Sequence, residues 1–114
     1  MRFRFTKHFP FSASYESSGK IYGHNYILGV TVSAALDRSA EEAFERDVRD
    51  VLVSRLESRD LGLHVDFLKG IAITDENLLR VFASILKNRL PWPLESLTLE
   101  RDRRTIATLT AEAS

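Results

Sequence analysis

The chain has 114 residues, of which 44% are hydrophobic, and its sixteen basic side chains balance sixteen acidic ones without a single cysteine. This length favours one domain over residues 1–114, because domains most often hold roughly 100–150 residues. The lack of cysteine excludes disulfides, thiolate metal sites and cysteine nucleophiles. A formal net charge of zero supplies no broad positive field for a phosphate backbone, so we expect no nucleic-acid partner.

The N-terminal residues lack the apolar core of a secretory signal. Arg2, Arg4, Lys7 and His8 interrupt the aromatic side chains there, whereas a signal peptide needs an uninterrupted apolar run. No later run approaches the ~20 apolar residues of a membrane span. We therefore expect a cytoplasmic protein with no membrane partner.

Two long strands are predicted in the first third of the chain. Hydrophobic side chains alternate over residues 1–15, with an interruption at Pro10, and again over residues 21–36. The turn-forming sequence E-S-S-G-K at residues 16–20 lies between them, which favours a long hairpin. His24 lies on the apolar parity of the second strand.

Two helices are predicted in the middle of the chain. Ser39 and Glu42 have the spacing of a capping box, and an amphipathic helix with one apolar stripe follows them. After a connector over residues 61–72, Thr74 is the expected N-cap of a second helix. That helix should end before the sequence P-W-P at residues 91–93, because proline removes a backbone donor.

Two short strands, residues 96–101 and 105–109, and a polar tail ending at Ser114 complete the order ββααββ. The expected fold is α+β, with an antiparallel four-stranded sheet and two helices on one face. The second face and the two sheet edges would then need cover, so we expect a homo-oligomer.

Four short motifs occur in order at residues 11–15 (F-S-A-S-Y), 22–26 (Y-G-H-N-Y), 74–78 (T-D-E-N-L) and 97–101 (L-T-L-E-R). They resemble F-S-A-A-H, H-G-H-N-Y, P-T-x-E-N-L and V-x-V-x-E-T of the 6-pyruvoyl-tetrahydropterin synthase family, which includes the 6-carboxy-tetrahydropterin synthases. The resemblance spans almost the whole chain and agrees with the element order read from periodicity.

The resemblance implies a tunnelling fold, in which subunits associate as a trimer or hexamer to form a β-barrel. It also implies pterin-like ligands at the interfaces between subunits. Enzymes of this family hold zinc with three histidines and transfer protons with a cysteine, an aspartate and a histidine. A glutamate of the late strand anchors the amino-pyrimidine edge of the pterin.

The zinc positions of the family are largely replaced here. Tyr15 and Tyr22 stand where the family has histidines, and His24 alone keeps its ligand. A tyrosine must lose a proton, with an ordinary pKa of about 10, before it coordinates well. We therefore expect no zinc cofactor, with His24 as the remaining candidate metal ligand and a ferric site on these three residues as an alternative. The two tyrosines should close the vacated site by stacking on each other or on a ligand.

The proton-transfer residues of the family are also disturbed. Ser18 replaces the cysteine, and a hydroxyl without an adjacent base is a weaker nucleophile than a thiol. The family's L-D-H-x-x-L-N corresponds loosely to residues 63–69, where Val65 takes the histidine position without a gap and His64 takes it after a shift of one residue. The candidate catalytic residues are Ser18, His64 and Asp66.

Glu100 is interpreted as the late-strand glutamate. Its carboxylate could accept two parallel hydrogen bonds from a 2-amino-pyrimidinone edge, a charge-assisted and geometrically selective pairing. The candidate ligand-binding residues are Glu100, Thr74 at the second helix start, Tyr15 and Tyr22.

Three functions remain open on these residues. The first is a homologue of the pterin synthases that binds a pterin- or purine-like heterocycle at a subunit interface and has lost the zinc-dependent catalysis. The second is a metal-independent, lyase- or aldolase-like enzyme acting on a pterin, since proton transfer alone contributes ~10²–10⁴-fold to a rate. The third is a non-catalytic structural or regulatory subunit.

Overall fold

The computed structural model describes residues 1–111. The expected polar tail up to Ser114 extends outside the described residues. In chain order the elements are β1 (Phe5–Ser17), β2 (Lys20–Val32), α1 (Arg38–Val48), a π-helical segment (Arg49–Val53), α2 (Ser54–Leu56), β3 (Arg59–Asp60), a 3-10 turn (Asp66–Leu68), α3 (Asp75–Arg89), β4 (Leu94–Arg101) and β5 (Thr105–Thr110).

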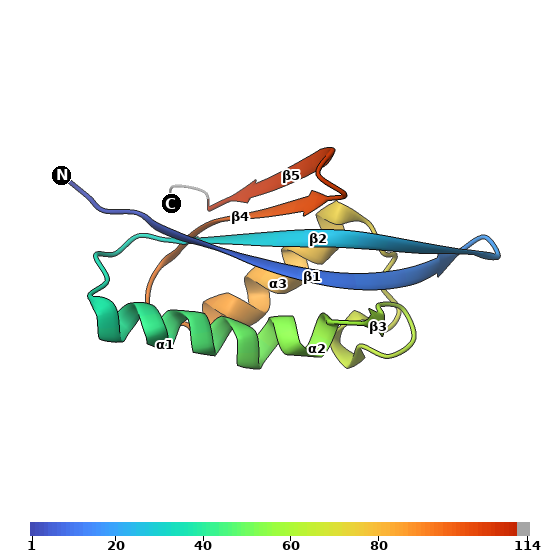
Figure 1. Ribbon diagram of the computed structural model, residues 1–114, viewed down its shortest axis with the longest axis horizontal. Helices are drawn as coiled ribbons and strands as arrows, with labels where there is room; N and C mark the ends of the chain where they lie inside the picture. The colour runs from blue at the N-terminus through green and yellow to red at the C-terminus, as the bar shows by residue number, and fades with distance from the viewer. Residues whose placement is uncertain (112–114) are drawn as a thin grey trace.

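The sheet has five strands in the order β3-β1-β2-β4-β5 (Figure 1). The predicted hairpin and the two C-terminal strands are present, and all their pairings are antiparallel. The predicted number of four strands is wrong because β3 pairs in parallel with β1 at Ala13 and Ser14. With two residues, β3 is too short to show any alternation in the sequence.

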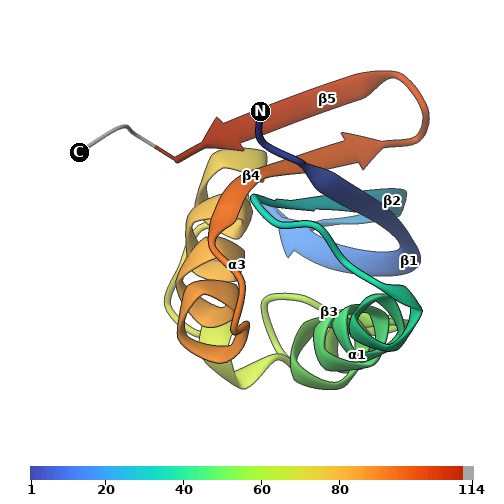
Figure 2. The ribbon, with the colours of Figure 1, turned by 90° about the vertical axis from the view of Figure 1, so that its left-hand side faces the viewer.

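The helices cover one face of the sheet, as predicted. The rod formed by α1, the π-helical segment and α2 runs beneath β1, and α3 packs beside it on the same side (Figures 1 and 2). Alternation along the strands directs Phe9 and Phe11 of β1, Leu28 of β2, and Leu97 and Leu99 of β4 into the core beneath. We call this side the helix-facing side and the other the open face.

The helix starts show which side chains act as caps. Thr74 is confirmed as the N-cap of α3, because its Oγ1 accepts a hydrogen bond from the backbone N–H of Asn77 at 3.1 Å. The prediction of a capping box at Ser39 is wrong. Asp37 caps α1 instead, accepting from the N–H of Ala40 at 2.8 Å, because Asp37 has the extended backbone of a cap while Ser39 lies inside the first turn.

The first two strands also differ in extent from the prediction. β2 ends at Val32, four residues before the predicted end, and β1 continues through Pro10 without interruption. Within residues 1–111, no strand pairs with the outer side of β1 at Pro10, since β3 reaches only Ala13 and Ser14. Proline is tolerated in such an edge position. None of the helices in the described part of the chain is long and apolar enough to cross a membrane.

Candidate functional site

An aromatic row lies on the helix-facing side where β1 and β2 leave the core. It consists of Tyr15, Tyr22, His24 and Tyr26, which the hairpin register brings together. Tyr15 and Tyr22 are opposite each other and stack, with ring centroids 5.4 Å apart and planes 21° from parallel. His24 contacts Tyr15 at 5.8 Å and meets Tyr26 edge-on at 5.7 Å. The predicted stacking of Tyr15 on Tyr22 is confirmed.

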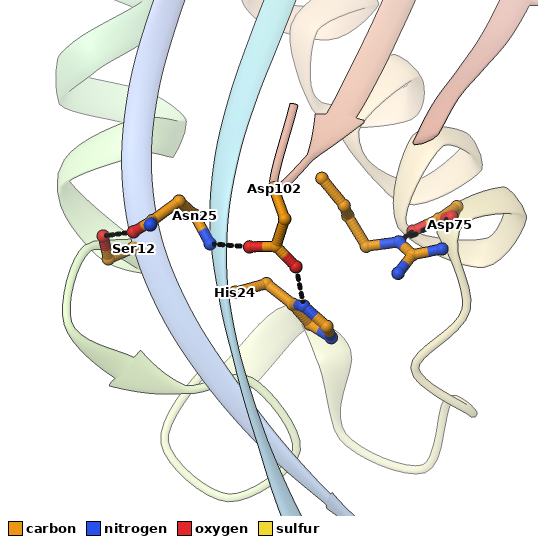
Figure 3. Close-up of polar contacts among 6 residues, drawn as sticks. Ser12, His24, Asn25, Asp75 and Asp102 are labelled. Carbon is orange, nitrogen blue, oxygen red and sulfur yellow. Dashed lines mark hydrogen bonds and ion pairs between the residues drawn. The ribbon is translucent and has the colours of Figure 1, made fainter. Parts of the chain in front are cut away.

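His24 is clamped by an aspartate from the turn between β4 and β5 (Figure 3). Nδ1 of His24 lies 2.6 Å from Oδ2 of Asp102, and Oδ1 of Asp102 accepts from the N–H of Asn25 at 2.9 Å. The hydrogen bond from the Asn25 N–H is the main cause that lowers the pKa of the Asp102 carboxyl, and the hydrogen bond with His24 is the second. In the neutral form of the imidazole, a carboxylate beside Nδ1 favours the tautomer with its proton on Nδ1, which leaves Nε2 as an acceptor.

The residues at the positions that the sequence resemblance assigns to zinc do not fit a zinc site. Tyr15 and Tyr22 are packed ring on ring, which leaves one imidazole where a zinc site of this kind uses three. Within residues 1–111, no group of three or more histidine, cysteine, aspartate or glutamate side chains is placed to hold a metal ion. That the protein works without zinc stays a prediction.

A small cavity lies between the aromatic row and the start of α3. Its volume is about 250 Å³, and we call it the Thr74 cavity; its lining residues are Tyr15, Tyr26, Ile73, Thr74, Asp75, Leu78 and Arg101. Thr74 and Asp75 are there because α3 starts at this point. Arg101 reaches it from the end of β4, and Tyr15 from the end of β1.

An ion pair dominates the electrostatics of the Thr74 cavity. Nε of Arg101 donates to both carboxylate oxygens of Asp75, at 2.9 and 3.0 Å. The hydrogen bond to Asp75 raises the pKa of Arg101, and burial raises the pKa of the Tyr26 hydroxyl. The cavity therefore presents a guanidinium that is paired with Asp75, and a phenol that keeps its proton.

Glu100 points away from this cavity. Leu97 and Leu99 of β4 are buried on the helix-facing side, so Arg101 shares their direction and Glu100 faces the open side. There Glu100 lines a wider groove of about 540 Å³ with Ser12, Asn25, Ile27, Glu57 and other residues of β1, β2 and the β4–β5 turn. The structure does not bring Glu100 together with Thr74, and its role as an anchor stays a prediction.

The register of the late strand explains this separation. In V-x-V-x-E the glutamate shares its face with both valines, because side chains two apart in a strand point the same way. The side chain two positions beyond Leu99 is Arg101. In this structure Arg101, and not Glu100, occupies the place that the motif gives to the glutamate.

The three candidate catalytic residues do not form one site. Ser18 lies exposed in the β1–β2 turn with a φ of 52°. His64 and Asp66 line a separate cavity of about 210 Å³ next to Arg55 and Arg59. Val65 between them is 2% exposed and belongs to the core.

Sequence reasoning missed Asp75, Arg101 and Asp102. For Arg101 the signal was available, because the parity of Leu97 and Leu99 already assigns it a face. Asp75 lies inside the T-D-E-N-L motif, which by itself indicates only the start of a helix. Asp102 carried no signal, since it meets His24 from 78 positions away in the chain.

Comparisons of the sequence and of the structure with known proteins differ in outcome. No model of a protein family matches the sequence, and no curated protein matches it. Among solved structures, the chain is similar to 6-pyruvoyl tetrahydropterin synthase of Caenorhabditis elegans, with a TM-score of 0.82 and 20% sequence identity. The match covers 98% of this chain and 97% of that one. The chain therefore has the tunnelling fold of that synthase, as the sequence motifs predict.

Proposed function

We propose that this protein is a divergent relative of the 6-pyruvoyl-tetrahydropterin synthases that binds a pterin- or purine-like heterocycle in the Thr74 cavity without zinc-dependent catalysis. The observation that carries this proposal is the position of the stacked Tyr15 beside Thr74, Asp75 and Arg101 in one cavity. A planar ring can lie against the phenol while polar groups at the α3 start fix its orientation.

A second subunit completes the site in this proposal. A cavity of about 250 Å³ is smaller than the roughly 300–1,000 Å³ of typical ligand sites, and it lies near the free end of the hairpin. The sheet also ends in β5 on one side and the two-residue β3 on the other, which leaves edge groups available for pairing between subunits. We expect a trimer or hexamer.

Isothermal titration with pterin, guanine and 7-deazaguanine tests the binding proposal. We expect at least one of them to bind, and Thr74→Val and Tyr15→Ala to weaken that binding about tenfold or more. Glu100→Gln is the matched control, because Glu100 lies on the other face. Absence of binding by all three compounds contradicts the proposal, and loss of binding in Glu100→Gln alone moves the ligand to the open-face groove.

Light scattering after size-exclusion chromatography tests the assembly. The proposal expects a mass of three or six chains at micromolar concentration. A monomer that persists up to millimolar concentration, and that still binds the heterocycle, contradicts the role of a second subunit.

A metal-independent enzyme acting on a pterin is the second candidate, and the His24–Asp102 clamp favours it. A carboxylate that orients one imidazole nitrogen leaves the other ready to accept a proton. Turnover of a dihydropterin in the presence of a chelator, lost in His24→Gln and reduced in Asp102→Asn, would support this function. No turnover over a long incubation with bound ligand present contradicts it.

A further inference from the structure

The Thr74 cavity carries a cation where the resembling motif carries a carboxylate, and this reverses the hydrogen-bonding character of the site. We propose that the cavity selects heterocycles that present an oxo or anionic edge, such as 2-oxo pteridines and purines, over those that present a 2-amino edge. This inference rests on the proposed function of the same cavity.

The guanidinium of Arg101 keeps donors free for a ligand. Its Nε is engaged by Asp75, whereas its two Nη nitrogens have no hydrogen-bond partner within residues 1–111. The Arg101 side chain is 29% exposed and the Asp75 side chain 20%, so the pair is partly shielded and still reachable. A guanidinium has five N–H donors and no acceptor, so it cannot accept a hydrogen bond from a ligand amino group.

The other polar groups of the cavity are mainly donors as well. Burial raises the pKa of the Tyr26 hydroxyl, which keeps its proton available. Thr74 Oγ1 accepts the Asn77 N–H at 3.1 Å and retains its own O–H for donation. Asp75 is the acceptor among them, and each of its oxygens already shares the Nε–H of Arg101, so the guanidinium competes with a ligand amino group for this carboxylate.

A 2-oxo group complements this set. The two Nη nitrogens can both donate to the 2-oxo oxygen, or to that oxygen and a deprotonated ring nitrogen beside it, in the charge-assisted pairing typical of arginine. A 2-amino edge would instead set its N–H groups against the guanidinium and leave donors on both sides unpaired, which is costly. We expect a preference of about ten- to hundredfold.

The test uses two pairs of compounds that differ at one substituent. Lumazine is the 2-oxo counterpart of pterin, and xanthine is the 2-oxo counterpart of guanine. Isothermal titration of the intact protein at pH 7 should give the lower dissociation constant for the 2-oxo member of each pair, by tenfold or more.

Variants of neighbouring residues identify the group responsible. Arg101→Gln should abolish the preference, whereas Arg101→Lys, which keeps the charge, should retain part of it. Glu100→Gln on the opposite face should leave the preference unchanged. Circular dichroism confirms that each variant is folded, and Arg101→Lys preserves the test if Arg101→Gln is unstable.

Each outcome bears on the inference. Equal affinities, or tighter binding of pterin and guanine, overturn the preference for an oxo edge and leave the binding proposal intact. If the preference persists in Arg101→Gln but disappears in Glu100→Gln, the group responsible lies on the open face. That result also overturns the inference. If none of the four compounds binds, the proposed function itself fails and the inference fails with it.

Discussion

Asp102, which orients His24, is itself held in place by several contacts. Its backbone has the left-handed φ of 51°, its N–H donates to the Asn25 carbonyl at 2.7 Å, and its carboxylate accepts from the Asn25 N–H and from His24. These contacts tie the β4–β5 turn to β2 next to the aromatic row. The imidazole orientation therefore depends on the ionised form of one carboxyl group.

Acid should release this clamp. Because the folded-state pKa of Asp102 is lowered, its ionisation stabilises the folded state above the ordinary aspartate pKa of about 3.9, and this stabilisation is lost as the pH falls through the lower folded value. We expect Asp102→Asn to destabilise the protein at about pH 6, and this effect to shrink progressively as the pH falls below the ordinary aspartate pKa. Urea denaturation of both proteins across this range measures the difference, and a constant difference contradicts the clamp.

Gly29 is required where β1, β2 and β4 meet on the open face. A Cβ at this position would lie against Oγ1 of Thr98 and 3.1 Å from Cδ2 of His8. Gly29→Ala should therefore cost about 1–3 kcal/mol of unfolding free energy. Gly23→Ala is the matched control in the same strand, since nothing lies within 4 Å of its Cβ. Equal effects of the two substitutions in thermal denaturation would show that the crowding at Gly29 is relieved at no cost.

At this scale, the sequence was informative where neighbours are set by local register. Tyr15 and Tyr22 lie opposite each other across a two-residue turn, and Thr74 accepts a hydrogen bond from the N–H of Asn77 three residues ahead. Both contacts followed from the sequence because the partners are close along the chain. Arg101 and Asp75 are 26 positions apart, and their pairing depends on how α3 packs against β4. No local pattern encodes that packing.

The conformation of the β1–β2 turn accounts for the position of Ser18 without a catalytic role. Ser18 and Gly19 have φ values of 52° and 78°, as required for both central residues of a type I′ turn. Asparagine tolerates this conformation better than serine, so Ser18→Asn should raise the unfolding free energy by roughly 0.5–1 kcal/mol.

Thermal denaturation measures that change, with Ser17→Asn in the adjoining strand position as the control that should give no gain. A loss of stability in Ser18→Asn would mean that the serine hydroxyl makes a contact that a turn role does not require. A gain would support the structural role over the catalytic one.

Among the elements, the long ones were predictable and the short ones were not. Residues of the hairpin strands and of α3 repeat the strand or helix period often enough to be recognised. β3 has two residues and forms only because Ala13 and Ser14 offer a free edge. The π-helical segment at Arg49–Val53 continues the apolar stripe of α1, so periodicity cannot distinguish it from α-helix.

In the whole molecule, the two candidate ligand regions lie on opposite faces of one sheet. The Thr74 cavity lies on the helix-facing side with Arg101, and the groove of Glu100 lies on the open face, where Ile106 is 63% exposed. The layer arrangement followed from the sequence because the strands alternate and the helices have one apolar stripe. Which face serves the ligand depends on the register of one strand.

Mapping of a bound heterocycle by NMR chemical shifts tests the heterocycle-binding cavity most directly. Titration of the isotope-labelled protein with lumazine should shift the signals of Tyr15, Thr74, Asp75 and Arg101 and leave those of Thr98 and Glu100 in place. Shifts confined to the open face around Glu100 would contradict a heterocycle site in the Thr74 cavity. An absence of shifts at the highest soluble concentrations of lumazine and pterin would contradict it as well.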